Sequence, residues 1–193
     1  MDRAKSDEVP WSIVPSLEKL GKNIMADREL LITTTPEMNY MVGWSPTKSH
    51  PYVTVYLPSL HRANAYLHVL VGHELFHPIV EDFVRTEKSK VDSQLRDECK
   101  DLLSGNKGSL PLFDQSRLDR VVLHTMRLWE KGLTELMCDM GAAAIFGPAA
   151  LFSFSSFACT RDMDQEPKAS TQYYPPWRLR LQTVIEYLSL IHI

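Results

Sequence analysis

Two histidines four residues apart are the side chains of this sequence best placed to do chemistry. His73, Glu74 and His77 form the pattern His-Glu-x-x-His, written HExxH. On an α-helix, side chains four residues apart lie one above the other, so both imidazoles can bind one metal ion. Zinc accepts neutral imidazole nitrogens and, in a catalytic site, keeps a water at its fourth position. The spacing predicts a zinc site in which Glu74 is the general base toward a metal-activated water.

The same pattern also arises by chance, as two surface histidines on an unrelated helix. Apolar neighbours favour the functional interpretation, because they predict a buried helix in which an isolated charged Glu74 would be costly. These neighbours are Val69, Leu70, Val71, Leu75 and Phe76.

The third zinc ligand has to come from outside the motif. The longer metzincin pattern HExxHxxGxxH is absent, since Val80 and Phe83 occupy its glycine and third-histidine positions. Glu81 lies one turn after His77 and is conceivable, but Pro78 disturbs the helix geometry between them. A carboxylate farther along the chain is the better candidate.

Glu135 is the preferred third ligand, in the unit Glu135-Leu-Met-Cys-Asp139. Glu135 can supply a carboxylate oxygen, and Asp139, one helical turn later, can accept the N–H of a ligating histidine and fix its tautomer. The alternative is that both carboxylates lie on a solvated helix face. Apolar and small neighbours favour the buried site: Leu133, Leu136, Met137 and residues 141–146.

HExxH followed after a long insert by ExxxD resembles the gluzincins. It is most similar to the metallopeptidase family that includes the CAAX prenyl proteases and the bacterial heat-shock membrane peptidases. The segment Tyr174-Pro-Pro-Trp-Arg-Leu-Arg180 resembles the His-Pro-Pro and Arg-Leu that follow the third ligand in that family. The resemblance covers roughly residues 53–181. It implies zinc bound by His73, His77 and Glu135, with Glu74 as catalytic base and Asp139 orienting a histidine.

Two positions depart from the family's pattern. Tyr174 stands where the family has histidine, and its phenol could donate a hydrogen bond to an oxyanion, so Tyr174 is a candidate catalytic residue. Pro78, directly after the second histidine, is unusual and is expected to tilt the helix. The multiple membrane spans common in the family are missing from this sequence.

The hydrophobic pattern predicts one α+β domain, mainly helical and zincin-like, with a small sheet packed on the HExxH helix. One or two short strands are expected in 30–44, and Pro78 is expected to kink or restart its helix. Surface loops are predicted at 104–111 and 160–176. Apolar residues at helical spacing predict helices over 11–25, from Ser59 to the His73 region, and over 79–103, 114–146 and 177–187.

The clearest strand is 51–58, which is rich in β-branched and aromatic residues and bounded by prolines. Its alternation predicts Tyr52, Thr54 and Tyr56 on one face, with the intervening apolar residues on the other. We expect an edge strand above the HExxH helix, where an extended peptide substrate would pair with it through main-chain hydrogen bonds.

Composition limits the classes of function. The chain has 193 residues, with 21 Lys+Arg against 24 Asp+Glu and 44% hydrophobic residues, which is typical of a globular domain. The formal net charge of −3 argues against a dedicated nucleic-acid binder. The three cysteines include no CxxC, so neither a disulfide framework nor a zinc ribbon is expected. A polar N-terminus with no signal-peptide pattern predicts a cytoplasmic protein.

The uncharged stretch from Met140 to Thr160 is long enough to span a bilayer in principle. Gly147-Pro148 near its middle and four hydroxyl side chains favour a broken core helix instead. Membrane association is therefore disfavoured, although a span stays an alternative.

The two ends of the chain are set apart from the domain. Residues 1–10 are predicted to be a flexible tail, and residues 11–187 the single metallopeptidase domain. Residues 188–193, Leu-Ser-Leu-Ile-His-Ile, resemble the translation of a sequencing adapter, which would mean that the natural chain continues differently after Tyr187. The alternative is a genuine amphipathic helix end.

Together these features predict a zinc metalloendopeptidase that hydrolyses a peptide or protein substrate. The alternatives are a zincin-fold regulatory or interaction module without turnover, and a metal-free scaffold. Other polar residues carry weaker signals. His124 is expected to be an ordinary helix histidine. Arg178 and Arg180 either pair with Asp139 or Glu130 or stay solvated, and the sequence slightly favours the second.

Overall fold

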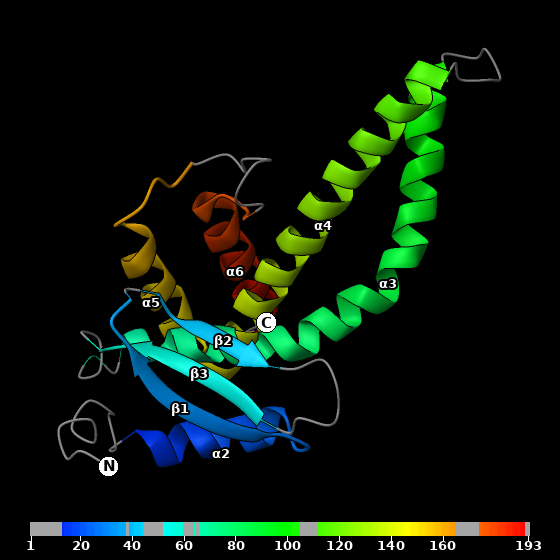
Figure 1. Cartoon of the computed structure of the whole chain (residues 1–193). Coiled ribbons are helices and arrows are strands. Elements are labelled where there is room, and N and C mark those ends of the chain that lie inside the picture. Colours follow the sequence, from blue (N-terminus) through cyan, green and yellow to red (C-terminus); the bar gives the residue numbers. More distant parts are fainter. Residues whose placement is uncertain are drawn as a thin grey trace.

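The computed structural model describes residues 13–37, 39–44, 52–59, 64, 66–104, 112–164 and 174–191. This part of the chain is mainly helical and includes one small three-stranded sheet, as predicted (Figure 1). The elements follow in the order α2 (Val14–Ile24), β1 (Glu29–Thr35), β2 (Met41–Trp44), β3 (Tyr52–Pro58), a short 3-10 helix η2 (Leu67–Val69), α3 (Leu70–Ser104), α4 (Leu112–Phe146), α5 (Pro148–Ala158) and α6 (Trp177–Ile191).

The sheet has the strand order β1-β3-β2. β1 pairs with β3 in parallel, and β2 pairs with the other side of β3 in the antiparallel sense. The predicted alternation in β3 is confirmed, because Val53, Val55 and Leu57 are fully buried. The expectation that this strand is an edge was wrong, since both of its sides are hydrogen-bonded to neighbours. β2, which pairs with β3, is an edge strand of the sheet.

The core lies between the sheet and the N-terminal part of α3. The three buried β3 side chains join Leu70, Val71 and Leu75 of α3 in one cluster, to which α5 and α6 also contribute. The β-branched side chains of β3 pack well on the pleated surface of the sheet. The N-terminal part of α3 covers this surface and buries them. This packing fixes the HExxH segment against the sheet.

The helix that carries the motif differs from the prediction at two points. It was expected to begin at Ser59, but Asn64 is not helical and α3 begins at Leu70, after the 3-10 turn. It was also expected to kink or restart at Pro78, and it does not restart there, because α3 runs without a break from Leu70 to Ser104. Pro78 supplies no N–H to the helical ladder and crowds the carbonyl one turn earlier. Buried residues of α3 before and after it, Leu75 and Val80 among them, hold the helix together by packing. Figure 1 shows that α3 changes direction along its length.

The C-terminal part of α3 and the N-terminal part of α4 form an arm that extends away from the sheet (Figure 1). Leu118, Val122 and Met126 are buried against Val91 and Leu95 inside this arm. Ion pairs join the two helices along its sides, at 2.6 Å between Arg96 and Asp119 and at 2.7 Å between Lys88 and Glu130.

The uncharged stretch 140–160 forms two core helices, as the sequence favoured. α4 ends at Phe146, Gly147 adopts a φ of 57°, and α5 begins with Pro148. Glycine reaches this left-handed conformation without steric cost, and proline is well suited to the first turn of a helix. None of the helices in the described residues is both long enough and apolar enough to cross a bilayer.

Some predictions fall on parts of the chain that the structure does not describe. The expected tail at 1–10 lies outside the described residues, as do 105–111 and 165–173 of the predicted loops.

α6 continues through Ile191, and Leu188 is buried in the main core. Cys99, Cys138 and Cys159 are free.

Candidate metal centre

The two histidines of the motif lie one above the other on the buried side of α3. Both side chains are buried, and their Nε2 atoms are 3.2 Å apart. Two nitrogens each about 2.0–2.1 Å from a tetrahedral zinc ion lie about 3.3 Å apart. The two imidazoles therefore already have the separation that a shared zinc ion requires.

Glu135 reaches the same point from α4. It is buried, its Oε2 lies 3.4 Å from His73 Nε2, and its Oε1 lies 3.9 Å from His77 Nε2. Zinc binds imidazole nitrogens and carboxylate oxygens, and Glu135 brings one oxygen close to each histidine. Glu81, the other candidate, is half-buried and lies in the wall of the adjoining cavity.

Glu74 lies between the two histidines in sequence and beside them in space. Ligand atoms of His73, Glu74 and His77 all lie within 4.8 Å of one another. Burial raises the pKa of Glu74 to about 7, because the ionised form loses hydration. A carboxyl group with a pKa near neutral is suited to accept and return a proton at that pH.

Asp139 holds His73 from the side opposite the second histidine. Asp139 Oδ1 lies 2.8 Å from His73 Nδ1, which leaves Nε2 directed toward His77 and Glu135. This is the contact expected of a carboxylate that orients a ligating imidazole. Asp139 is fully buried, so its charge needs further partners.

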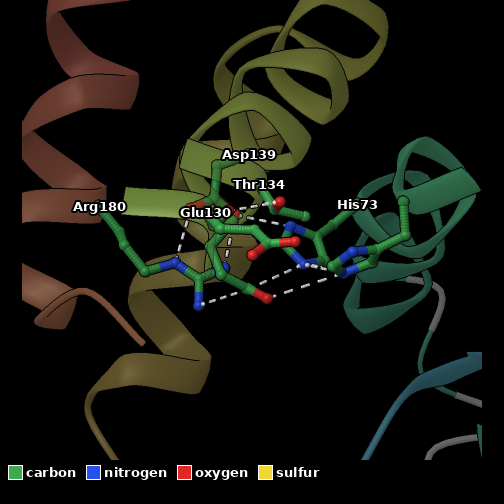
Figure 2. Close-up of polar contacts among 7 residues, drawn as sticks. His73, Glu130, Thr134, Asp139 and Arg180 are labelled. Carbon is green, nitrogen blue, oxygen red and sulfur yellow. Dashed lines mark hydrogen bonds and ion pairs between the residues drawn. The ribbon is translucent and has the colours of Figure 1, made fainter. Parts of the chain in front are cut away.

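Arg180 of α6 supplies those partners (Figure 2). Its Nε and Nη2 donate hydrogen bonds to the two Asp139 oxygens at 2.6 and 2.7 Å, and its Nη1 lies 3.2 Å from Glu135 Oε2. The slight preference for a solvated Arg180 was wrong, because the planar guanidinium matches a carboxylate in two places. Arg178 instead pairs at the surface with Asp164.

The charges of this group set the protonation of the two histidines. Burial alone would lower the pKa of His73, but the Asp139 and Glu135 carboxylates outweigh it and raise the pKa to about 10. Burial and the nearby charge of His73 lower the pKa of His77 to about 4. Before metal binds, His77 is thus a neutral ligand and His73 carries the proton that a metal ion has to displace.

Aromatic rings that the sequence analysis did not single out support the two imidazoles. Trp44 of β2 stacks on His77 with ring centroids 6.3 Å apart, and Phe154 of α5 meets His73 edge to face at 6.2 Å. These rings restrict both imidazoles from the sheet side and the α5 side. Nothing in their sequence spacing linked them to the motif, because each comes from a separate element.

A cavity of about 530 Å³ opens beside the histidines, and Glu74 and Glu135 also line it. Tyr174, the candidate oxyanion donor, lines this cavity and is 44% exposed. The structure therefore brings all six predicted residues to one place: His73, Glu74, His77, Glu135, Asp139 and Tyr174. Of the other histidines, His124 is exposed on α4, His68 is buried in η2, and His61 lies outside the described residues.

Comparison with protein-family models, with curated proteins and with solved structures found no match. The gluzincin resemblance therefore stays a prediction that rests on the motif residues.

Proposed function

We propose that this chain is a zinc-dependent peptidase of zincin-like fold. The observation that carries the proposal is the convergence of two imidazoles and a buried carboxylate at zinc-ligand spacing, on the floor of an open cavity lined by Glu74. A bound zinc ion supplies a Lewis acid and lowers the pKa of water to near neutral. His73, His77 and Glu135 would hold the ion.

Glu74 and Tyr174 have separate parts in this proposal. The Glu74 carboxylate takes a proton from the attacking water and returns it to the leaving amine. The Tyr174 hydroxyl, at the cavity wall, donates a hydrogen bond to the developing oxyanion. Asp139 and Arg180 hold the His73 ring in place and balance the buried charge.

The sheet offers a place for an extended substrate. β2 is an edge strand, and its residues Met41, Val42 and Trp44 line the cavity. A peptide that adds to this edge would gain main-chain hydrogen bonds and run past the histidines. Main-chain pairing with the substrate, first predicted for the strand 51–58, is thus assigned to β2, because β3 has no unpaired side.

Hydrolysis of an unstructured protein such as casein by the zinc-loaded chain tests the proposal. Glu74→Gln should retain zinc and lose at least 100-fold in rate, because general-base catalysis contributes about 10²–10⁴-fold. Glu81→Gln, at another carboxylate of the cavity wall, is the matched control and should keep its activity. Zinc binding with no Glu74-dependent hydrolysis would instead favour a regulatory module.

A further inference from the structure

A row of basic side chains follows the outer face of α4, apart from the candidate metal centre. At 100° per residue its five members fall within an arc of about 80°. All five are exposed, and we call them the basic row: Arg117, Arg120, His124, Arg127 and Lys131. From first to last the row is about 21 Å long, at 1.5 Å per residue.

The row carries only positive charge because the acidic side chains in this part of α4 form ion pairs with α3. Asp119 forms an ion pair with Arg96 of α3, and Glu130 forms one with Lys88. Both pairs join α4 to α3, on the side where its apolar residues are buried. The opposite side of the helix is therefore left positive in a chain whose net charge is −3.

Within the part of the chain that the structure describes, no carboxylate forms an ion pair with Arg117, Arg120, Arg127 or Lys131, and Lys131 interacts electrostatically with Glu81. Arg120 Nε donates only a long hydrogen bond of 3.4 Å to the carbonyl of Ser116. These cations are available to a partner from outside the chain.

Apolar side chains lie beside the basic row. Val121 is 40% exposed and Leu128 is 39% exposed, and both fall on the helix face adjacent to the cations. Arg117, Arg120 and Val121 also border a shallow hollow on this face. The surface therefore suits a partner that presents negative charges and apolar groups together.

The row leads to the candidate metal centre. Lys131, its last member, lines the same cavity as Glu74, and Glu135 follows one turn later on α4. A chain lying along the row toward Lys131 would continue into the cavity, past the two histidines.

We propose that the basic row binds an acidic segment of the peptide substrate, next to the residues that enter the cavity. This inference rests on the proposed peptidase function. An extended chain at about 3.3 Å per residue covers 21 Å with about six or seven residues. A row one side chain wide suits a single extended polypeptide, with acidic residues opposite the cations and apolar ones beside Val121 and Leu128. A nucleic acid or a membrane would present a much wider field of negative charge.

The test is binding of a fluorescent seven-residue peptide in which glutamates alternate with leucines, measured by anisotropy on the zinc-loaded Glu74→Gln protein. Reversing two charges in Arg120→Glu/Arg127→Glu should weaken binding at least tenfold, and binding should weaken with added salt. The matched control is Lys90→Glu/Lys100→Glu, which makes the same charge change at exposed positions of α3 and should alter binding less than twofold. Circular dichroism checks that both variants fold.

Equal binding of the glutamine counterpart peptide would overturn the inference, as would unchanged binding after charge reversal. It would also be overturned if phosphatidylserine vesicles or an oligonucleotide, and not the peptide, bound in a way that the reversal abolished. The two proposals fail separately. Hydrolysis of neutral peptides without acidic-peptide binding would reject the basic row alone. Reversal-sensitive peptide binding without Glu74-dependent hydrolysis would reject the peptidase and keep the row as a docking surface.

Discussion

Asp139 has two tasks at the candidate metal centre, since it contacts His73 on one side and Arg180 on the other. Asp139→Asn keeps the shape but removes the charge that orients and polarises the imidazole. We expect a loss of about 10–100-fold in zinc affinity, as for other carboxylates that support a ligating histidine. Competition with a fluorescent zinc chelator measures the effect. Asp164→Asn, which changes the surface partner of Arg178, is the control and should leave zinc affinity unchanged.

The same residues predict how the stability of the zinc-free protein depends on pH. Arg180 and the charged His73 overcome burial and lower the pKa of Asp139 to about 2, so its contribution is present above about 4 and is lost as the pH falls toward 2. The pKa of His73 is raised to about 10, so its contribution is full below about 6.5 and is lost as the pH rises through 10.

Urea denaturation of the zinc-free chain should therefore give a free energy of unfolding that decreases between pH 7 and pH 10. His73→Asn, which cannot be protonated, should flatten this alkaline decrease. An equally steep decrease in the variant would show that His73 does not carry the charge assigned to it.

At this scale the sequence predicted the candidate zinc ligands and the candidate base better than the residues that support them. His73, Glu74 and His77 were found because helical geometry alone sets their spacing. Glu135 and Asp139 were found because two carboxylates in an apolar stretch are costly to bury unless they have partners. Which cation balances Asp139 depends on how α6 packs against α4, and this cannot be read from spacing. Arg180 was therefore assigned to solvent, although it is buried.

At the scale of the elements, the site depends on how closely α3 and α4 approach. A Cβ atom at Gly141 of α4 would lie 2.6 Å from the ring of Phe76 on α3, closer than packed atoms tolerate. The helices meet at this point, one residue before His77 and two after Asp139. A side chain here would push apart the elements that carry the candidate ligands.

Gly141→Ala should therefore lower the free energy of unfolding by up to about 2 kcal/mol, because an overpacking cost of about 1–3 kcal/mol outweighs a gain in helix propensity of about 1 kcal/mol. Gly132→Ala in the same helix is the control, since its nearest neighbour would be Pro175 Cγ at 3.8 Å. It should stabilise the protein by about 0.5–1 kcal/mol. Urea denaturation compares the two, and a stabilised Gly141→Ala would contradict the close approach.

The elements themselves followed largely from local pattern. The strand 51–58 and the long helix from about 114 to 146 are present because alternation and helical spacing report burial directly. The restart predicted at Pro78 does not occur, since tertiary packing holds α3 through a residue that favours a break. The strand order could not be predicted, because pairing depends on long-range contacts, and so β3 was taken for the edge in place of β2.

The molecule as a whole has two parts. In the body, the sheet packs on the HExxH segment, and the arm is formed by α3 and α4. The hydrophobic pattern predicted a mainly helical domain but not the arm, whose ion pairs join residues as far apart in the sequence as Lys88 and Glu130. α4 links the two parts, since it carries the basic row on the arm and Glu135 and Asp139 in the body.

The central claim is that His73, His77 and Glu135 together hold one zinc ion. Elemental analysis of the purified chain, alongside His77→Ala and Glu135→Ala, tests it most directly, with His124→Ala as a control for a histidine outside the site. We predict one zinc per chain in the wild type and in His124→Ala, and loss of the metal in the other two variants. Zinc retained in Glu135→Ala would show that the third ligand is wrong. A wild-type chain without metal, even after zinc is supplied, would contradict the account.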